Sequence, residues 1–152
     1  MLQKIIEPGP TITEGRLLSF ANGYNLDLPK TYRDFLLRNN GGRPVPAAFP
    51  IKGFSENPFG VIDAFFGLGV AVQTEDLDNI MAELIDSIPI GVLPIACTES
   101  DDFICIDLRE VVDGAIVYWD RRPFWGNNIW NESDLYRVAD NFALLLTKLD
   151  DF

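Results

Sequence analysis

Three apolar runs of strand length follow one another closely in the second half of the chain, at residues 92–97, 103–108 and 115–119. Short polar turns separate them, whereas a parallel connection between strands needs a crossover of about a dozen residues or more. The first turn holds residues 99–102 and the second contains Asp113-Gly114, and both are typical turn sequences. The runs must therefore pair as an antiparallel meander, and any fold for this chain has to contain it.

Helical periodicity directly precedes the meander. In residues 77–88, apolar side chains recur at i, i+3, i+4, i+7, i+8 and i+11, which predicts a helix with one buried face. Thr74 is the predicted N-cap of this helix. Glu75 and Asp76 follow in the first turn, where the helix dipole favours negative charge.

Three further helices are predicted towards the two ends of the chain. One begins after Thr13, and a second opens at Leu28-Pro29, where proline fits the first helical position. Asn40-Gly41-Gly42 ends the second helix, since glycine readily adopts the left-handed conformation of a C-cap. The last helix is predicted over residues 135–149, which carry another apolar stripe.

Two more strands are predicted between these helices, at residues 48–54 and 61–66. Helices near both ends with strands between them indicate an α+β fold, with helices packed against a largely antiparallel sheet. At 152 residues the chain has the length of one domain, and no internal repeat divides it. We therefore predict a single domain over residues 1–152.

The formal net charge is −11, and almost all of the excess lies in one stretch. Residues 75–120 contain twelve acidic residues and a single basic one, Arg109, whereas the flanking stretches are nearly neutral. Such a field repels nucleic acid and attracts basic partners. The same charge can also serve only to keep the surface solvated. The sequence leaves both interpretations open.

The composition excludes several classes of enzyme. The chain has no histidine, so a Ser-His-Asp or Cys-His site, a histidine-ligated zinc and a histidine general base are impossible. A hydrolase could still use two facing carboxylates, but nothing singles out two of the 23 acidic residues. We predict a binding protein with no catalytic residues, no cofactor and no metal. A carboxylate-based hydrolase or metal enzyme is the alternative.

The two cysteines, Cys97 and Cys105, are too few for a disulfide framework and form no CxxC motif. They are interpreted as small core residues. No apolar run reaches the ~18 residues that a membrane span needs. Residues 1–10 lack the apolar segment of a secretory signal. We expect a cytoplasmic protein with reduced thiols that binds neither membrane nor nucleic acid.

Glu99, Asp101 and Asp102 place three carboxylates in four residues, which suggests a divalent cation. Their spacing is not that of an EF-hand, because the required glycine and the bidentate glutamate are missing. A polar hairpin turn needs the same residue types for its own backbone hydrogen bonds. We favour the turn over a metal site.

All three tryptophans, Trp119, Trp125 and Trp130, fall within twelve residues that also hold Arg121 and Arg122. Trp and Arg are among the residue types most enriched at the energetic centres of protein interfaces. Alternatively, the rings cover the edge of the core. We predict that Trp119 lies in the core, and both roles stay open for Trp125 and the arginines.

Four blocks, taken in order, make the chain resemble the SUKH superfamily, bacterial relatives of the Smi/Knr cell-wall regulator of yeast. Residues 28–36 with Asn39-Asn40-Gly41-Gly42 are similar to the family's LP-x-x-Y-x-x-F-L … NGG pattern. The other blocks are residues 91–96, similar to its central strand entry, 113–120, similar to its G-x-V-Y-x-W-D strand, and 138–142, similar to its closing helix. The resemblance covers about residues 13–149 and implies a mixed, curved sheet flanked by helices. One departure is Asp101-Asp102, where the family often has a glycine–aspartate pair.

The resemblance implies immunity as the function, because many bacterial members bind a toxin domain, frequently a nuclease, and block it. Nucleases tend to be basic because they hold phosphates, so an acidic inhibitor would associate faster through electrostatic steering. Other members are regulatory or scaffold proteins, which is the alternative function. The oligomeric state stays open. We predict that a basic cognate toxin domain is bound by Glu75, Asp76, Glu99, Asp101, Asp102, Trp119, Asp120, Arg121 and Trp125.

Overall fold

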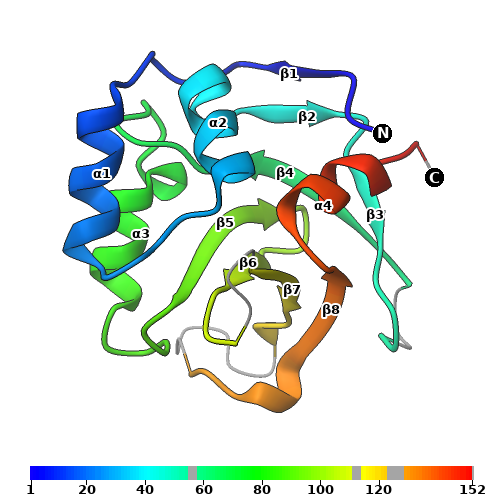
Figure 1. Ribbon diagram of the computed structural model, residues 1–152. Helices are drawn as coiled ribbons and strands as arrows, with labels where there is room; N and C mark the ends of the chain where they lie inside the picture. The colour runs from blue at the N-terminus through cyan, green and yellow to red at the C-terminus, as the bar shows by residue number, and fades with distance from the viewer. Residues whose placement is uncertain (55–57, 111–113, 123–128, 152) are drawn as a thin grey trace.

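A six-stranded sheet forms the centre of the fold, with the strand order β3-β4-β5-β6-β7-β8 and antiparallel pairing between all neighbours (Figure 1). The computed structural model describes residues 1–54, 58–110, 114–122 and 129–151. The sheet is strongly curved and nearly barrel-like, and a separate two-stranded ribbon, β1-β2, lies beside it. The strands are β1 (Lys4–Ile6), β2 (Arg43–Val45), β3 (Ala48–Pro50), β4 (Phe59–Phe65), β5 (Val92–Thr98), β6 (Phe103–Asp107), β7 (Ala115–Trp119) and β8 (Leu135–Ala139).

The predicted meander is present as β5, β6 and β7. Leu93 pairs with Ile106, which in turn pairs with Ile116, and all three side chains are buried. Apolar side chains on neighbouring strands thus stack at the same height, which is the usual unit of sheet stabilisation. The α+β fold class is confirmed.

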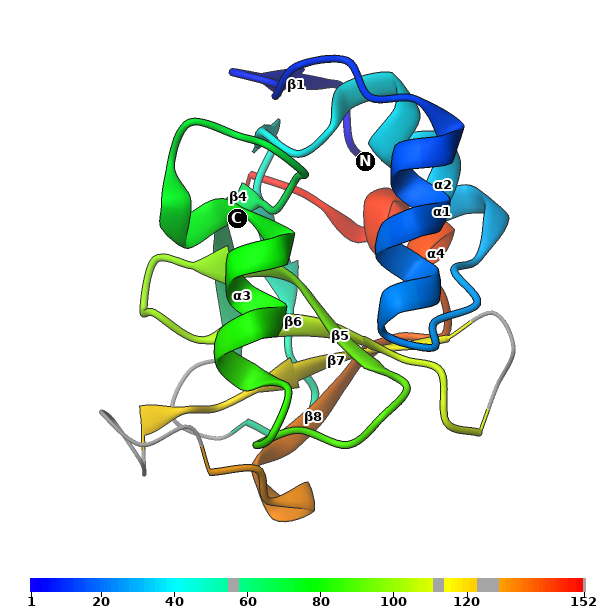
Figure 2. The same cartoon turned by 90° about the vertical axis from the view of Figure 1, so that its left-hand side faces the viewer.

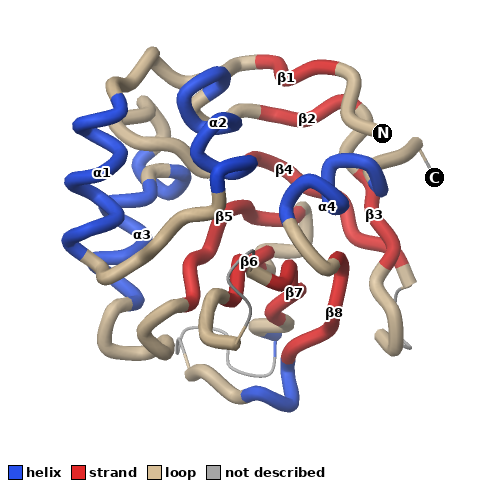
Figure 3. Tube along the Cα trace, in the orientation of Figure 1, coloured by secondary structure: helices blue, strands red, loops and turns tan. Residues whose placement is uncertain are grey.

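The described residues form four α-helices that flank the sheet, namely α1 (Glu14–Gly23), α2 (Lys30–Asn39), α3 (Leu77–Leu84) and α4 (Phe142–Lys148). Thr13 caps α1 as predicted, since its side chain accepts a hydrogen bond from the Arg16 backbone N–H. In Figure 3, α2 and α4 lie in front of the band of strands, and Figure 2 shows α3 across β5 and β6. An ion pair between Arg16 and Asp78 joins α1 to α3.

Three predicted helix boundaries are wrong: the starts of the third and last helices, and the end of the third, which lies at Leu84 rather than at Ile88. Thr74 is not the cap of the third helix, because residues 73–75 form a short 3-10 turn, η1 (Gln73–Glu75), and Asp76 caps α3 instead. Residues 135–139 are strand β8 rather than the start of the last helix. Pairing with β7 overrides the helical spacing there, with Leu135 opposite Trp119, and α4 begins only after Asn141 caps it.

An aromatic cluster joins α2 and α4 to the sheet. The ring of Phe35 in α2 lies 4.9 Å from that of Phe65 in β4 and 5.2 Å from that of Phe142 in α4, measured between centroids. Tyr32 lies 5.1 Å from Phe142 in the same way. All four side chains are buried, and such tilted contacts between aromatic rings add to the stabilisation from burial.

Asn40, at the end of α2, ties three separate segments together. Its amide nitrogen donates to the carbonyl oxygens of Pro10 at 2.7 Å and Leu68 at 2.8 Å, and its side-chain oxygen accepts from the Leu68 N–H at 2.8 Å. Its φ of 48° is left-handed, which asparagine tolerates better than most residues. Gly67 packs directly on it, since a Cβ there would lie 2.3 Å from the Asn40 carbonyl oxygen. The Asn-Gly-Gly pattern therefore marks a junction as well as a helix end.

Both ends of the described chain pack beside α4. The Leu2 N–H donates to the Leu146 carbonyl oxygen at 2.8 Å, and Asp150 exchanges two backbone hydrogen bonds with Ala48 of β3. In Figure 1 both termini lie on the side opposite α1 and α3. None of the helices in the described ranges has the length and apolar character that a membrane crossing would need.

Candidate functional site

A groove of about 470 Å³ lies between α3 and the strands β5 and β6. Carboxylates line its rim, and apolar side chains with one thiol line its floor. The rim acids come from four separate segments and are Asp63, Glu75, Glu83 and Asp101. The floor is formed by Ile80, Leu84, Cys97 and Phe103. We refer to this feature as the acidic groove.

The amphipathic pattern of α3 sets the inner wall of the acidic groove. Ile80 and Leu84 are one turn apart and turn their buried side chains towards the sheet. Glu83 is three residues after Ile80 and is exposed, so it stands at the rim. The spacing of Ile80, Glu83 and Leu84 on α3 thus places a carboxylate beside the apolar floor.

Asp76 holds the start of α3 rather than lining the acidic groove. One of its carboxylate oxygens accepts from the Asp78 N–H at 2.9 Å, and the other accepts from the Gly69 N–H at 3.0 Å. The side chain is buried, and both oxygens are used. Asp76 is therefore an N-cap whose carboxylate already serves the protein's own backbone.

Arg43 compensates the charge at one end of the acidic groove. Its guanidinium lies 3.3 Å from the carboxylate of Asp63, 3.5 Å from that of Glu75 and 2.8 Å from that of Glu7. The hydrogen bond with Glu7 and the nearby carboxylates raise the pKa of Arg43. The negative charge of Asp63 and Glu75 at this end of the acidic groove is thus partly neutralised.

Arg121 occupies the other end. Its guanidinium stacks 4.0 Å from the ring centre of Phe103, and one guanidinium nitrogen donates to the backbone oxygen of Asp101 at 3.3 Å. Burial lowers the pKa of Arg121, although it stays a cation at any physiological pH. The stacking holds the Arg121 guanidinium against Phe103 in the floor, close to the rim acids Glu83 and Asp101.

The turn between β5 and β6 separates the roles of two neighbouring aspartates. Asp101 has a φ of 62° and is exposed, and it stands where the family often has glycine. Aspartate is one of the few residues that tolerate this left-handed conformation. Asp102 is fully buried, and its carboxylate accepts from the Tyr118 hydroxyl and, at 2.7 Å, from the Arg121 N–H. The departure from the family pattern therefore keeps the turn.

The structure brings only part of the predicted binding set together. Glu75, Asp101 and Arg121 line the acidic groove, and Glu99 is exposed nearby on the same turn as Asp101. The side chains of four others are buried, namely Asp76, Asp102, Trp119 and Asp120. Trp125 lies outside the described residues.

The buried members of that set have visible structural partners. Trp119 lies in the core as predicted, 5.0 Å from the ring of Trp130. Asp120 accepts from the backbone N–H of Arg122 at 3.1 Å and forms an ion pair with its guanidinium at 3.0 Å. No sequence signal pointed to Asp63 or Phe103, whereas Glu83 could have been found from its place beside the apolar stripe of α3.

The two thiols have different surroundings. Cys97 lies at the floor of the acidic groove, where burial raises its pKa to about 11, so the thiol is protonated at neutral pH. Cys105 is fully buried, and burial raises its pKa as well. They are not cross-strand partners, because Cys97 is opposite Phe103 and Cys105 is opposite Pro94, and both are free.

The described residues contain no group of three or more Cys, Asp or Glu side chains placed to hold a metal ion. In the turn that suggested a cation, Asp102 points inward to Tyr118 while Asp101 is exposed. Of the three carboxylates in this turn, that of Asp102 therefore has a structural role, because it accepts hydrogen bonds from Tyr118 and Arg121.

Together, the curved sheet, its flanking helices and the acidic groove define an α+β protein with a groove lined by carboxylates on its surface. Residues 11–148 match the model of the SMI1 / KNR4 family (SUKH-1), and the chain belongs to this family. The family is generally associated with immunity proteins. No curated protein and no solved structure matches the chain.

Proposed function

We propose that this protein is a non-enzymatic immunity protein that binds a basic cognate toxin domain and blocks it. The observation that carries the proposal is the acidic groove, in which four carboxylates from separate segments surround an apolar floor. The family's association with immunity supports it.

The acidic groove suits a lysine or arginine side chain of the partner. Ile80 and Leu84 of the floor can take the apolar stem, while the rim carboxylates take the charged head. Arg43 pairs with Asp63 and Glu75, and Arg121 lies close to Glu83 and Asp101, so an incoming cation shares the rim carboxylates with the protein's own arginines. Basic residues that a nuclease uses to hold phosphate are natural occupants, and covering them would block the toxin.

The net charge of −11 supports fast association with such a partner. Long-range attraction raises association rates by about 10- to 1,000-fold at low salt and fades as salt screens it. A cytoplasmic location, where an immunity protein would meet an incoming toxin, belongs to the same proposal. The second candidate is a scaffold or regulatory protein that uses the same groove for a partner unrelated to toxins.

The partner can be identified by affinity capture from the native host, and a toxin gene directly upstream would favour immunity over scaffolding. Co-expression then tests the function. We expect the chain to rescue growth of cells that express the captured toxin domain, and failure of rescue despite binding would favour the scaffold.

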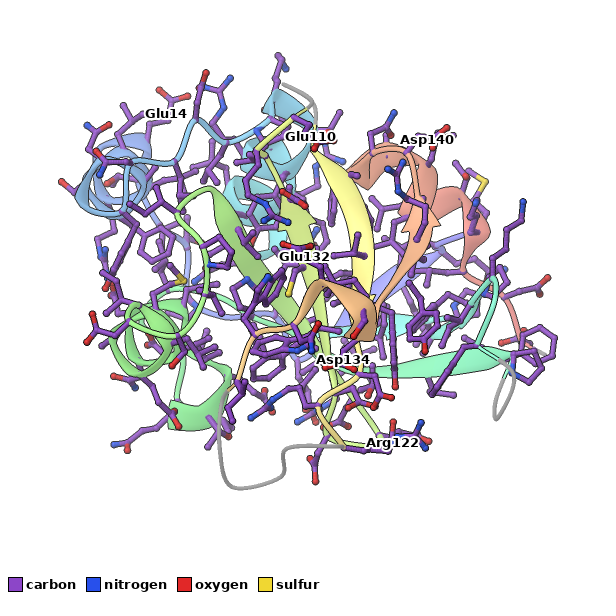
Figure 4. All side chains as sticks on the ribbon, turned by 90° about the horizontal axis from the view of Figure 1, so that it is seen from below. Glu14, Glu110, Arg122, Glu132, Asp134 and Asp140 are labelled. Atoms are coloured by element: carbon purple, nitrogen blue, oxygen red, sulfur yellow. The ribbon has the colours of Figure 1, made fainter. Side chains whose placement is uncertain are left out.

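Association kinetics test the acidic groove itself. Glu83→Gln with Asp101→Asn should lower the association rate about tenfold at low salt and flatten its salt dependence. A matched control, Glu110→Gln with Asp140→Asn, removes the same charge at exposed positions away from α3 (Figure 4). If both double variants slow association equally, net charge rather than the acidic groove steers the partner.

A further inference from the structure

A second groove, of about 270 Å³, lies on the other flank of α3, between that helix and the end of α1. Its lining is mainly apolar. It comes from the end of α1, from α3 and from the segment that leads into β5, and includes Tyr24, Leu26, Met81, Ile85, Ile88 and Ile90. We refer to it as the apolar groove.

The apolar groove leaves two large aliphatic side chains in water. Ile90 is 76% exposed and Ile85 is 47% exposed, whereas the neighbouring Met81 and Ile88 are buried. Single exposed apolar residues are common, but two beside a hollow with an apolar lining form a contiguous patch. Such patches mark contact sites in soluble proteins.

Helix α3 forms a shared wall between the two grooves. Ile80, Glu83 and Leu84 face the acidic groove, while Met81 and Ile85, one turn apart, face the apolar groove. Since an α-helix with its side chains is only about 10–12 Å wide, one partner lying across α3 meets both grooves.

The charge around the apolar groove identifies its occupant. Asp86 lines it, and none of its described lining residues is basic. Glu83 lies three residues before Asp86, near the end of α3. Binding of an apolar side chain in the apolar groove is therefore strongest when basic residues flank that side chain in the partner, because they face the nearby carboxylates.

We infer that the apolar groove is the anchoring half of one interface whose steering half is the acidic groove. The occupant is an apolar side chain of the same basic partner, placed about one helix width from its basic cluster. This inference rests on the proposed function. The acidic groove then governs how fast the partner arrives, and the apolar groove governs how slowly it leaves.

Two synthetic peptides test the inference on the full chain. Both carry three arginines separated by glycines, then a Gly/Ser spacer of about four residues, which spans ~13 Å when extended. One peptide ends in leucine and the other in serine. We expect the leucine peptide to bind about tenfold more tightly by calorimetry, and to lose that gain in Ile90→Ser and in Ile85→Ser with Ile90→Ser.

The controls separate this inference from the proposed function. Leu144→Ser, at an exposed apolar position on α4, should keep the gain, and the exposure of Ile90 means that its single variant should fold. If both peptides bind equally, or if the gain survives Ile90→Ser and the double variant, the apolar anchor is wrong while the acidic groove stands. If the serine peptide fails to bind, or binds as well to Glu83→Gln with Asp101→Asn, the acidic groove is wrong and the inference falls with it.

Discussion

The hydroxyl of Tyr118 in β7 donates a hydrogen bond to the buried carboxylate of Asp102, at the start of β6. The other oxygen of that carboxylate accepts from the Arg121 N–H at 2.7 Å. One buried acid thus holds the turn before β6 against the end of β7 and fixes the backbone of a groove residue. The position of Arg121 in the acidic groove therefore depends on Tyr118 and Asp102, which are both buried.

Tyr118→Phe should lower the free energy of unfolding by about 1–2 kcal/mol, because one oxygen of the buried Asp102 carboxylate loses the Tyr118 hydroxyl and keeps only the longer hydrogen bond from the Ser100 hydroxyl, at 3.4 Å. Urea unfolding followed by circular dichroism measures the change. Glu99→Ala, at an exposed position in the same turn, serves as the control and should stay within about 0.5 kcal/mol of wild type. Equal stability of Tyr118→Phe and wild type would show that the pair contributes nothing.

Tyr32→Phe should have the opposite effect. The Tyr32 hydroxyl is fully buried beside Phe142 and has no hydrogen-bond partner within the described part of the chain. Burial also raises the pKa of this hydroxyl strongly. Removing an unsatisfied buried hydroxyl should raise the free energy of unfolding by up to about 1 kcal/mol. A loss of stability as large as that of Tyr118→Phe would mean that the hydroxyl does have a partner.

Asp102 should contribute its own pH dependence to the stability of the protein. Burial raises the pKa of the Asp102 carboxyl above its usual value, so the folded state holds this proton more tightly than the unfolded state. The corresponding stability is fully present below the unfolded pKa of about 3.9 and is lost as the pH rises through the raised value.

Asp102→Asn is the reference that isolates this contribution. Arg109 lowers the pKa values of Asp107 and Glu132, and these acids change stability in the opposite direction with pH. The quantity to measure is therefore the stability of wild type minus that of the variant, from urea unfolding between about pH 4 and pH 7. It should fall as the pH rises, and a flat difference would contradict the raised pKa.

Asn40→Gly should cost about 2–4 kcal/mol, since it keeps the left-handed backbone but removes the hydrogen bonds to Pro10 and Leu68. Asn40→Ala should cost about 1 kcal/mol more, because alanine also strains at a φ of 48°. Thermal unfolding of the two variants separates the contributions. If the two variants unfold at the same temperature, backbone strain at this position is negligible.

The sequence predicts the parts of the fold that are encoded locally. The meander of β5 to β7 follows from short turns, and the start of α1 follows from Thr13, whose cap needs only its own neighbours. Strand β8 could not be predicted this way. The spacing of Leu135, Val138 and Ala139 suits a helix, and only the pairing of Leu135 with Trp119 decides otherwise.

The acidic groove is harder to predict, because its rim is assembled from segments far apart in the chain, from Asp63 to Arg121. Charge placement singled out Glu75 and Asp101, and both line the acidic groove. It could not distinguish them from Asp76 and Asp102, whose carboxylates face the protein's own N–H and hydroxyl groups. Whether a carboxylate faces solvent or the protein's own backbone depends on tertiary packing, which cannot be predicted from the local sequence.

The meeting of both chain ends beside α4 bears on how binding can be measured. Leu2 is hydrogen-bonded to Leu146 of α4, and Asp150 is hydrogen-bonded to Ala48 of β3. Both termini lie on the side opposite α1 and α3 (Figure 1). A tether attached at either end would anchor the molecule to a sensor surface with both grooves turned to the flowing solution. Kinetic constants obtained from the two immobilisation formats should therefore agree.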